Sequence, residues 1–211
     1  LGDPGRTGAS CAAVALLLLG ALRSRAATNY VASSTRIAVW GENSLEQTNV
    51  PSGLSNVVAV AAGGSHSLAQ LKDGSVVVWG DDFVGVRPVP QDLTNVIAVA
   101  AGQFHGLALR SDHTVVAWGA GGQGQTNWPH FGQSIVPPNL SNVMAIGCGY
   151  FHSLAVRADG TIETWGFNDV GQRDLPANLT NAIAVAAGKD HSLFLCASGT
   201  VTVAGPSFHA N

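Results

Sequence analysis

Four histidines recur at regular spacing, and repeated histidines could bind a metal or act as general bases. His66, His105, His152 and His191 are separated by 39, 47 and 39 residues. A metal or catalytic site needs several side chains around one point, whereas these four recur one to a repeat and no second repeated ligand type accompanies them. They therefore represent one structural position, for which we expect a hydrogen-bonding or packing role.

The other reactive residue types offer no better catalytic candidate. Asp73, Asp112 and Asp159 lie at expected hairpin turns, where aspartate is a turn former. Cys148 and Cys196 occupy different positions of successive repeats, which favours buried free thiols over a disulfide and gives no metal-ligand spacing. The chain also lacks a phosphate-binding glycine loop and a serine nucleophile elbow. We expect no catalytic, cofactor-binding or metal-binding residue, hence no cofactor and not an enzyme.

The histidines belong to a tandem repeat that is also marked by Trp-Gly pairs. Those pairs begin at Trp40, Trp79, Trp118 and Trp165, with spacings of 39, 39 and 47 residues. Self-similarity at such a period is the signature of stacked repeat architectures. Four whole units are predicted, at 48–86, 87–125, 126–172 and 173–211.

Each unit carries three strand signals. The first unit has an apolar run at 57–63, a run that starts at His66 and a run that ends in Trp-Gly at 76–80. Asp-Gly or Ser-Gly pairs between the second and third runs supply the positive φ angles of a tight hairpin, whereas Asp112-His113 predicts a slightly different turn. A three-stranded meander cannot bury both faces alone, so neighbouring units must stack.

We predict an all-β fold, a β-propeller of short three- to four-stranded blades. The Ala and Gly of the first runs suit the crowded strands nearest a propeller axis, and Val and Leu would fill the space between blades. Besides its four units the chain has one unmatched third strand at 36–41, but the last unit already has its own at 200–205. About four and a third blades are thus expected, in an open arc or a fragment of a larger propeller.

The stretches VAVAAGGSHSLAQLKDGSVVVWG and MAIGCGYFHSLAVRADGTIETWG resemble the repeats of the regulator of chromosome condensation family, and the resemblance covers about 29–211. The short unit and the linker at 47–51 are most similar to the family's bacterial branch, which includes a secreted β-lactamase inhibitor protein built as a seven-bladed propeller. Seven blades of this length would need roughly 270 residues. The resemblance implies the fold more strongly than the function.

Functional candidates lie in the loops that differ between units. Because strand direction alternates, the loop before each histidine and the loop after each Trp-Gly share one face. Aromatic residues ringed by polar ones are typical of a protein-recognition patch, although each ring could instead only cover its own blade. The aromatic candidates are Phe83, Phe104, Tyr150, Phe151 and Phe167, and the rim charges are Asp81, Asp82 and Asp190. In inhibitor-like relatives, the resemblance implies, aromatic residues before the histidine lie on the partner-binding face.

An eight-residue expansion of the third unit adds Trp128, His130 and Phe131 to a Gly-rich linker, 119–138. A long loop with aromatic residues on a rigid scaffold can form a binding finger. Inserted loops are also tolerated neutrally, and both interpretations stay open.

The first 27 residues differ from the rest. A short segment with Arg6 leads into an apolar run at 11–22, followed by small and basic residues. This run is short for a membrane span but suits a secretory signal; a short membrane anchor or a miscalled start sequence is the alternative. We predict a signal peptide at 1–27 and a repeat domain at 28–211, located outside the cell, in the periplasm or at the cell surface, with no membrane span in the mature chain.

The net charge of −3 becomes −5 without Arg6, Arg23, Arg25 and Asp3, which leaves seven basic and twelve acidic residues. The chain therefore has no basic stripe for nucleic-acid phosphates, and we expect no nucleic-acid partner.

Three functions are open to a protein of this kind. The first is a secreted scaffold that binds an unknown protein partner, including as an inhibitor of an extracellular enzyme such as a β-lactamase. The second is a guanine-nucleotide exchange regulator of a small GTPase, the activity best known for the family's nuclear members, which a secretory signal would disfavour. The third is an enzyme that works on a propeller face, for which no carboxylate or nucleophile cluster is present.

Overall fold

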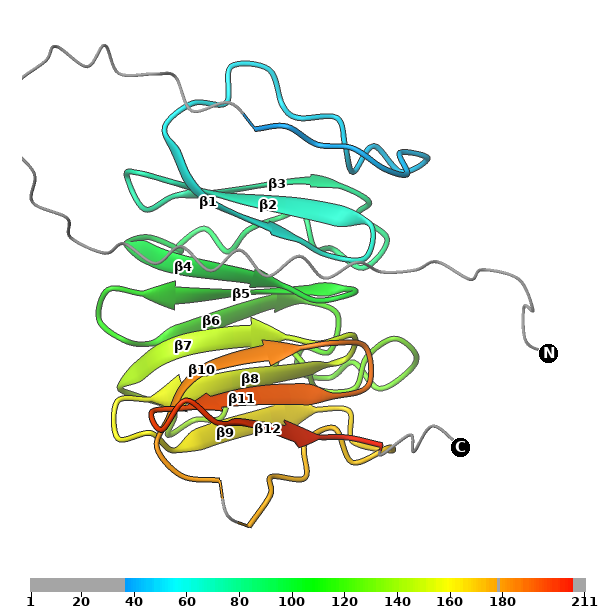
Figure 1. Cartoon of the computed structure of the whole chain (residues 1–211). Helices are drawn as coiled ribbons and strands as arrows, with labels where there is room; N and C mark the ends of the chain where they lie inside the picture. Colours follow the sequence, from blue (N-terminus) through cyan, green and yellow to red (C-terminus); the bar gives the residue numbers. More distant parts are fainter. Residues whose placement is uncertain (1–36, 178, 207–211) are drawn as a thin grey trace, which may run out of the picture.

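The computed structural model describes residues 37–177 and 179–206, so the predicted signal peptide at 1–27 lies outside it. Those residues form four three-stranded antiparallel sheets (Figure 1). The first sheet contains β1 (Val57–Ala62), β2 (His66–Leu71) and β3 (Val76–Gly80), and the second β4 (Val96–Ala101), β5 (His105–Arg110) and β6 (Val115–Gly119). The third contains β7 (Val143–Cys148), β8 (His152–Arg157) and β9 (Ile162–Gly166), and the fourth β10 (Ala182–Ala187), β11 (Ser192–Cys196) and β12 (Val201–Ala204).

Every sheet is a meander in which the second strand pairs with both others. The first strand has a register shift near its start, for example between Val96 and Ala98. Equivalent shifts follow Val57, Val143 and Ala182. The residue within each shift is an exposed apolar one, and these are Val58, Ile97, Met144 and Ile183.

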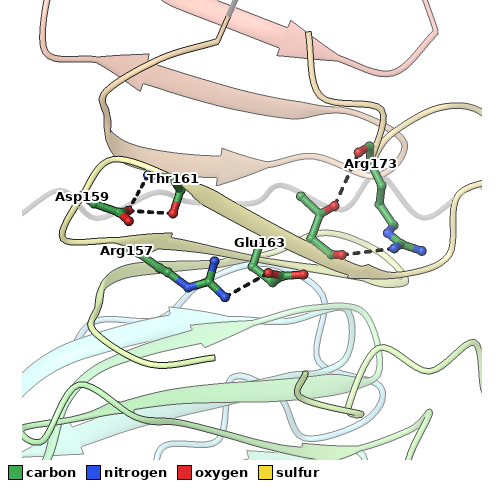
Figure 2. Close-up of polar contacts among 6 residues, drawn as sticks. Arg157, Asp159, Thr161, Glu163 and Arg173 are labelled. Carbon is green, nitrogen blue, oxygen red and sulfur yellow. Dashed lines mark hydrogen bonds and ion pairs between the residues drawn. The ribbon is translucent and has the colours of Figure 1, made fainter. Parts of the chain in front are cut away.

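The hairpin turn between the second and third strands is alike in the first three sheets. Asp159 accepts hydrogen bonds from the backbone N–H and the hydroxyl of Thr161, at 2.9 and 2.6 Å (Figure 2). These bonds lower the pKa of the Asp159 carboxyl. The expectation of a different turn at Asp112-His113 was wrong, because Asp112 makes the same pair of bonds to Thr114. His113 takes the positive φ of 65° that glycine supplies elsewhere, and its ring bonds the Val143 carbonyl of the next sheet at 2.9 Å.

The sheets pack face to face in chain order. We call the face of a sheet that packs against the next sheet its trailing face, and the opposite one its leading face. Leu107 on the trailing face of the second sheet lies in one apolar cluster with Ala155 and Trp165 on the leading face of the third. Equivalent clusters join the first sheet to the second and the third to the fourth. Branched and aromatic side chains therefore fill the space between sheets, as predicted.

Polar contacts hold together the third sheet and the linker that follows it (Figure 2). Arg173, in the linker between them, donates to the carbonyls of Thr164 and Gly166 at 3.1 and 2.7 Å. Arg157 and Glu163 form an ion pair at 3.1 Å across β8 and β9. The linker is thereby tied to the last strand of the sheet that it leaves.

The four sheets form an open arc, as predicted. The first strands of successive sheets contact one another, β1 with β4, β4 with β7 and β7 with β10. The strand expected at 36–41 is not formed, because residues 37–41 have no regular structure and Arg36 lies outside the described part. This segment lies beyond the first sheet in Figure 1, where Ile37 packs against Val57, Ala69 and Trp79.

Two cysteines lie in the described part of the chain. Cys148 and Cys196 are buried and unpaired, and burial raises the pKa of the Cys148 thiol. No helix in this part of the chain has the length and apolarity needed to cross a membrane.

Candidate protein-binding face

Backbone hydrogen bonds hold the two predicted loop sets together at one end of the sheets. The residue after each Trp-Gly donates its N–H to the carbonyl of the residue before the histidine. Asp81 bonds Ser65 at 2.8 Å, Ala120 bonds Phe104 at 2.8 Å and Phe167 bonds Phe151 at 2.9 Å. Strand alternation predicted this shared face, and the bonds fix the loops in pairs over the first three sheets.

Seven aromatic rings from these loops make one continuous cluster, which we call the aromatic face. Phe151 lies at its centre and contacts four other rings, Phe104, Phe131, Tyr150 and Phe167, at centroid distances of 5.8, 4.9, 4.6 and 6.0 Å. Phe104 also contacts Tyr150 at 6.3 Å and Trp128 at 5.5 Å, and Trp128 contacts Phe83 at 6.4 Å. Phe131 and Phe167 are 4.6 Å apart. The rings therefore bridge neighbouring sheets instead of covering one sheet each.

Exposure divides the aromatic face into a covered middle and an open edge. Phe104, Tyr150, Phe151, Phe131 and Phe167 are half-buried. Phe83 is 67% exposed and Trp128 is 62% exposed. Large rings held in contact with other rings but open to solvent on one side are the usual anchors of protein interfaces.

The expanded linker of the third unit folds back onto this face. His130 accepts a hydrogen bond from the Gly121 N–H on its Nδ1 atom at 2.9 Å, so its ring braces the base of the linker. Pro129 is buried, while the neighbouring Trp128 and Phe131 join the aromatic face. Of the three linker candidates, His130 thus supports the loop and the two aromatic residues form its surface.

The predicted rim charges also make hydrogen bonds and ion pairs within the loops. Asp81 accepts the Phe83 N–H at 3.0 Å, and Asp82 accepts the Arg87 N–H at 2.9 Å. Asp190 is paired with Lys189 at 3.7 Å. The Lys189 ammonium lies 5.5 Å from the centroid of the Tyr150 ring, a cation–π contact that sequence reasoning did not identify.

Beneath the aromatic face, the repeated histidines join one sheet to the next. His105 Nε2 lies 2.9 Å from the hydroxyl of Ser153, and His152 Nε2 lies 2.9 Å from that of Ser192. Ser153 donates its only hydroxyl hydrogen to the Gln133 carbonyl at 2.9 Å, so His105 must donate from Nε2. The first junction differs, because Gly106 stands where the serine would be and His66 Nε2 has no partner.

Burial keeps three of the histidines neutral. It lowers the pKa of His66 to about 4 and the pKa of His105 to about 3, the latter with a smaller contribution from the repulsion between its protonated ring and protonated His66 and His152. The pKa of His152 is about 4, mainly through burial. His191, which directly precedes β11 of the last sheet, is exposed. No group of three or more His, Cys, Asp or Glu in residues 37–177 and 179–206 could hold a metal ion.

The glutamines of the linkers are structural residues that sequence reasoning missed. Gln133 is fully buried, and its side chain accepts the Phe131 N–H at 2.7 Å and donates to the Pro129 carbonyl at 2.7 Å. Its own carbonyl accepts the Trp165 indole N–H at 2.8 Å. Gln172 accepts the Val170 N–H at 3.1 Å in the same way. A Gln that recurs a short distance after Trp-Gly is the sequence signal that could have identified this structural role.

Radially stacked three-stranded antiparallel sheets define a repeat protein of the β-propeller class. The sequence profile of the regulator of chromosome condensation (RCC1) repeat matches residues 57–85, 96–125 and 144–172. Three of the four units therefore carry regulator of chromosome condensation repeats.

Solved structures agree on the fold. Prp20p from Saccharomyces cerevisiae matches with a TM-score of 0.59 and 20% identity, over 71% of this chain and 44% of that one. The ectodomain of the receptor kinase CR4 from Physcomitrella patens matches with a TM-score of 0.61 and 20% identity, over 79% and 46%. Human WBSCR16 matches with a TM-score of 0.57 and 23% identity, over 71% of this chain and 47% of that one. The chain thus spans less than half the length of these proteins, and no curated protein sequence matches it significantly.

Proposed function

We propose that this chain is a scaffold that binds another protein through its aromatic face. The observation that carries the proposal is the continuous cluster of seven rings, of which Phe83 and Trp128 are mostly exposed. Soluble proteins rarely leave such rings together on one surface without a partner. Large aromatic residues on rigid loops give much contact area for little loss of conformational freedom.

The surroundings of the rings favour a protein over a nucleic acid. Asp81, Asp82 and Asp190 lie in the loops that carry the face, and Lys189 is the one lysine there. Acidic groups at the edge would repel phosphates. Protein binding also fits the structural relative Prp20p, whose structure was reported with its binding to Gsp1p and histones.

For the location and the partner we keep the predictions made from the sequence. The run at 11–22 supports a secreted, periplasmic or cell-surface protein, and an extracellular enzyme such as a β-lactamase is then a candidate partner. Exchange of guanine nucleotide on a small GTPase is the alternative that follows from the family. Two assays separate them: inhibition of β-lactamase hydrolysis, and release of labelled GDP from a small GTPase.

The experiment that tests protein binding compares two variants in affinity capture from extracellular protein. Phe83→Ala with Trp128→Ala removes the two most exposed rings, and Ile97→Ser removes an apolar side chain of similar exposure from β4. We expect the double variant to lose a protein that the wild type and Ile97→Ser retain, at least about tenfold as judged by quantitative mass spectrometry. Equal capture by all three proteins would overturn the proposal.

A further inference from the structure

The open edge of the aromatic face consists of Phe83 and Trp128, whose ring centroids are 6.4 Å apart with an angle of 48° between the planes. Trp128 is held from behind by Phe104, which it meets at 77° and 5.5 Å. Phe83 and Trp128 are nevertheless 67% and 62% exposed, so much of each ring surface meets solvent. The face of an aromatic ring carries negative partial charge and attracts cations.

Two carboxylates lie in the loop that carries Phe83. Asp81 accepts the Phe83 N–H at 3.0 Å, and Asp82 accepts the Arg87 N–H at 2.9 Å. These bonds hold the carboxylates in the loop and use one oxygen, Oδ1, of each. In the part of the chain that the structure describes, neither carboxylate forms an ion pair. The open edge therefore combines two exposed rings with two uncompensated negative charges.

The chain supplies no cation of its own to this edge. The linker that carries Trp128, at 119–138, contains neither lysine nor arginine. The only basic residue between positions 81 and 90 is Arg87, and it engages Asp82 through its backbone N–H. Among the described residues no lysine or arginine makes a cation–π contact with Phe83 or Trp128. Electrostatic complementarity then favours a positively charged group on whatever binds there.

The opposite edge of the aromatic face shows such a contact completed within the chain. The Lys189 ammonium lies 5.5 Å from the centroid of the Tyr150 ring and 3.7 Å from the Asp190 carboxylate. A ring and a carboxylate thus hold one cation between them. The open edge offers the same two kinds of group without the cation.

We propose that the open edge is a subsite for an arginine side chain of the protein partner. Its guanidinium would lie on the ring of Trp128 or Phe83 and donate to the carboxylates of Asp81 and Asp82. Arginine fits better than lysine, because its guanidinium is planar, stacks on aromatic rings, is weakly hydrated and presents several donors in a fixed fork. This inference rests on the proposed function, since the arginine belongs to the protein that binds the aromatic face.

Titration of the ¹⁵N-labelled chain with N-acetyl-arginine amide tests the subsite without the partner. The probe should shift the indole N–H signal of Trp128, which is identified by its loss in Trp128→Phe. N-acetyl-citrulline amide has a planar neutral urea in place of the guanidinium, and it should bind at least about fivefold more weakly. Equal binding of the two probes would overturn the proposal, as would tighter binding of N-acetyl-lysine amide or no shift of the Trp128 signal.

Two variants test the role of the carboxylates in the same titration. Asp81→Asn with Asp82→Asn keeps an oxygen acceptor for the loop hydrogen bonds but removes both charges, so it should weaken arginine binding at least about fivefold. Asp169→Asn is the control, because Asp169 is exposed in the equivalent loop of the third sheet, and it should bind like the wild type. Thermal melts show whether each variant is folded. Unchanged binding by the double variant would overturn the proposal.

Affinity capture separates this inference from protein binding itself. Asp81→Asn with Asp82→Asn should lose the captured protein about as strongly as Phe83→Ala with Trp128→Ala does. If only the ring variant loses it, protein binding by the aromatic face stands and the arginine subsite is wrong. If both variants retain it, the proposed function and the subsite are both wrong.

Discussion

Between the sheets the same contacts recur, whereas the loops above them differ in every unit. Trp79, Trp118 and Trp165 each donate their indole N–H to the carbonyl of a linker residue 32 positions earlier in the chain. The residues before the histidines, in contrast, change from Gly-Ser to Gln-Phe, Tyr-Phe and Lys-Asp. A repeated interior allows each sheet to stack on the last, while the loops are free to differ, as the proposed binding role requires.

Lowering the pH should have the largest effect on the contacts between the sheets, because three histidines buried there are neutral in the folded chain. Their folded pKa values of about 3 to 4 lie below the ordinary 6.5, so the unfolded chain binds protons that the folded chain excludes. These three histidines should add no pH dependence to the free energy of unfolding above pH 7. Between pH 6.5 and about 4 it should fall by roughly 1.4 kcal/mol per pH unit for each histidine.

Chemical denaturation at a series of pH values measures this loss. His191→Ala is the matched control, since that histidine is exposed. Because His191 makes only a secondary contribution, after burial, to the low pKa of His152, its removal should change the slope much less than removal of a buried histidine. A free energy of unfolding that stays flat from pH 7 to pH 5 would show that the buried rings do not resist protonation.

A side chain at Gly63 should break the first junction. A Cβ atom there would meet the His66 ring and would lie 2.6 Å from the Gly102 carbonyl of the next sheet. We expect Gly63→Val to destabilise the protein by about 3 kcal/mol, seen as a lower Tm. Gly122→Ala is the control, because its Cβ would meet only Gln125 at 3.4 Å. Equal melting temperatures would contradict this account of the repeated glycine.

Two rings of the aromatic face should differ in how much they contribute to the stability of the protein. Phe151 contacts four other rings, and we expect Phe151→Ala to lower the free energy of unfolding by about 2 kcal/mol. Phe83 is mostly exposed, so Phe83→Ala should change it by less than about 0.5 kcal/mol. Urea titrations of both variants give the two values, and a larger loss for Phe83→Ala would reverse the assignment.

The smallest effect concerns the serine that receives the histidine. Ser153→Ala leaves the buried His105 Nε2 without its partner and removes one of the two donors to the Gln133 carbonyl, which keeps the Trp165 indole N–H. This should cost about 1.5 kcal/mol. Ser67→Ala removes a similar bond to a linker carbonyl but faces no histidine in the described chain, and it should cost about 0.5 kcal/mol. Equal losses of unfolding free energy in a denaturant titration would mean that the histidine contact adds nothing to stability.

The sequence predicted the features that the repeat determines, namely the strands and the face on which the loops lie. The Trp-Gly and histidine spacings gave the strands, and strand alternation placed Phe104 and Phe167 on one face. The contacts between units were not predictable, because they depend on how each sheet is rotated against the next. For that reason the central place of Phe151 and the Lys189–Tyr150 contact appear only in the structure. The strand expected at 36–41 failed because an isolated Trp-Gly pattern does not show whether a pairing strand is available.

The turn at His113 teaches a related point about local rules. Its sequence lacks the glycine that a positive φ normally requires, yet the ring bonds the Val143 carbonyl at 2.9 Å. A contact with the next sheet thus supports a backbone conformation that the local sequence disfavours.

Oxidative footprinting of the tryptophans tests the aromatic face most directly. Trp128 is 62% exposed on that face, and Trp40, which is 86% exposed near the first sheet, serves as an internal control. With the protein captured by the wild-type chain present, we predict that oxidation of Trp128 falls several-fold while oxidation of Trp40 is unchanged. An unprotected Trp128 in the saturated complex would contradict the proposal that the aromatic face binds the partner.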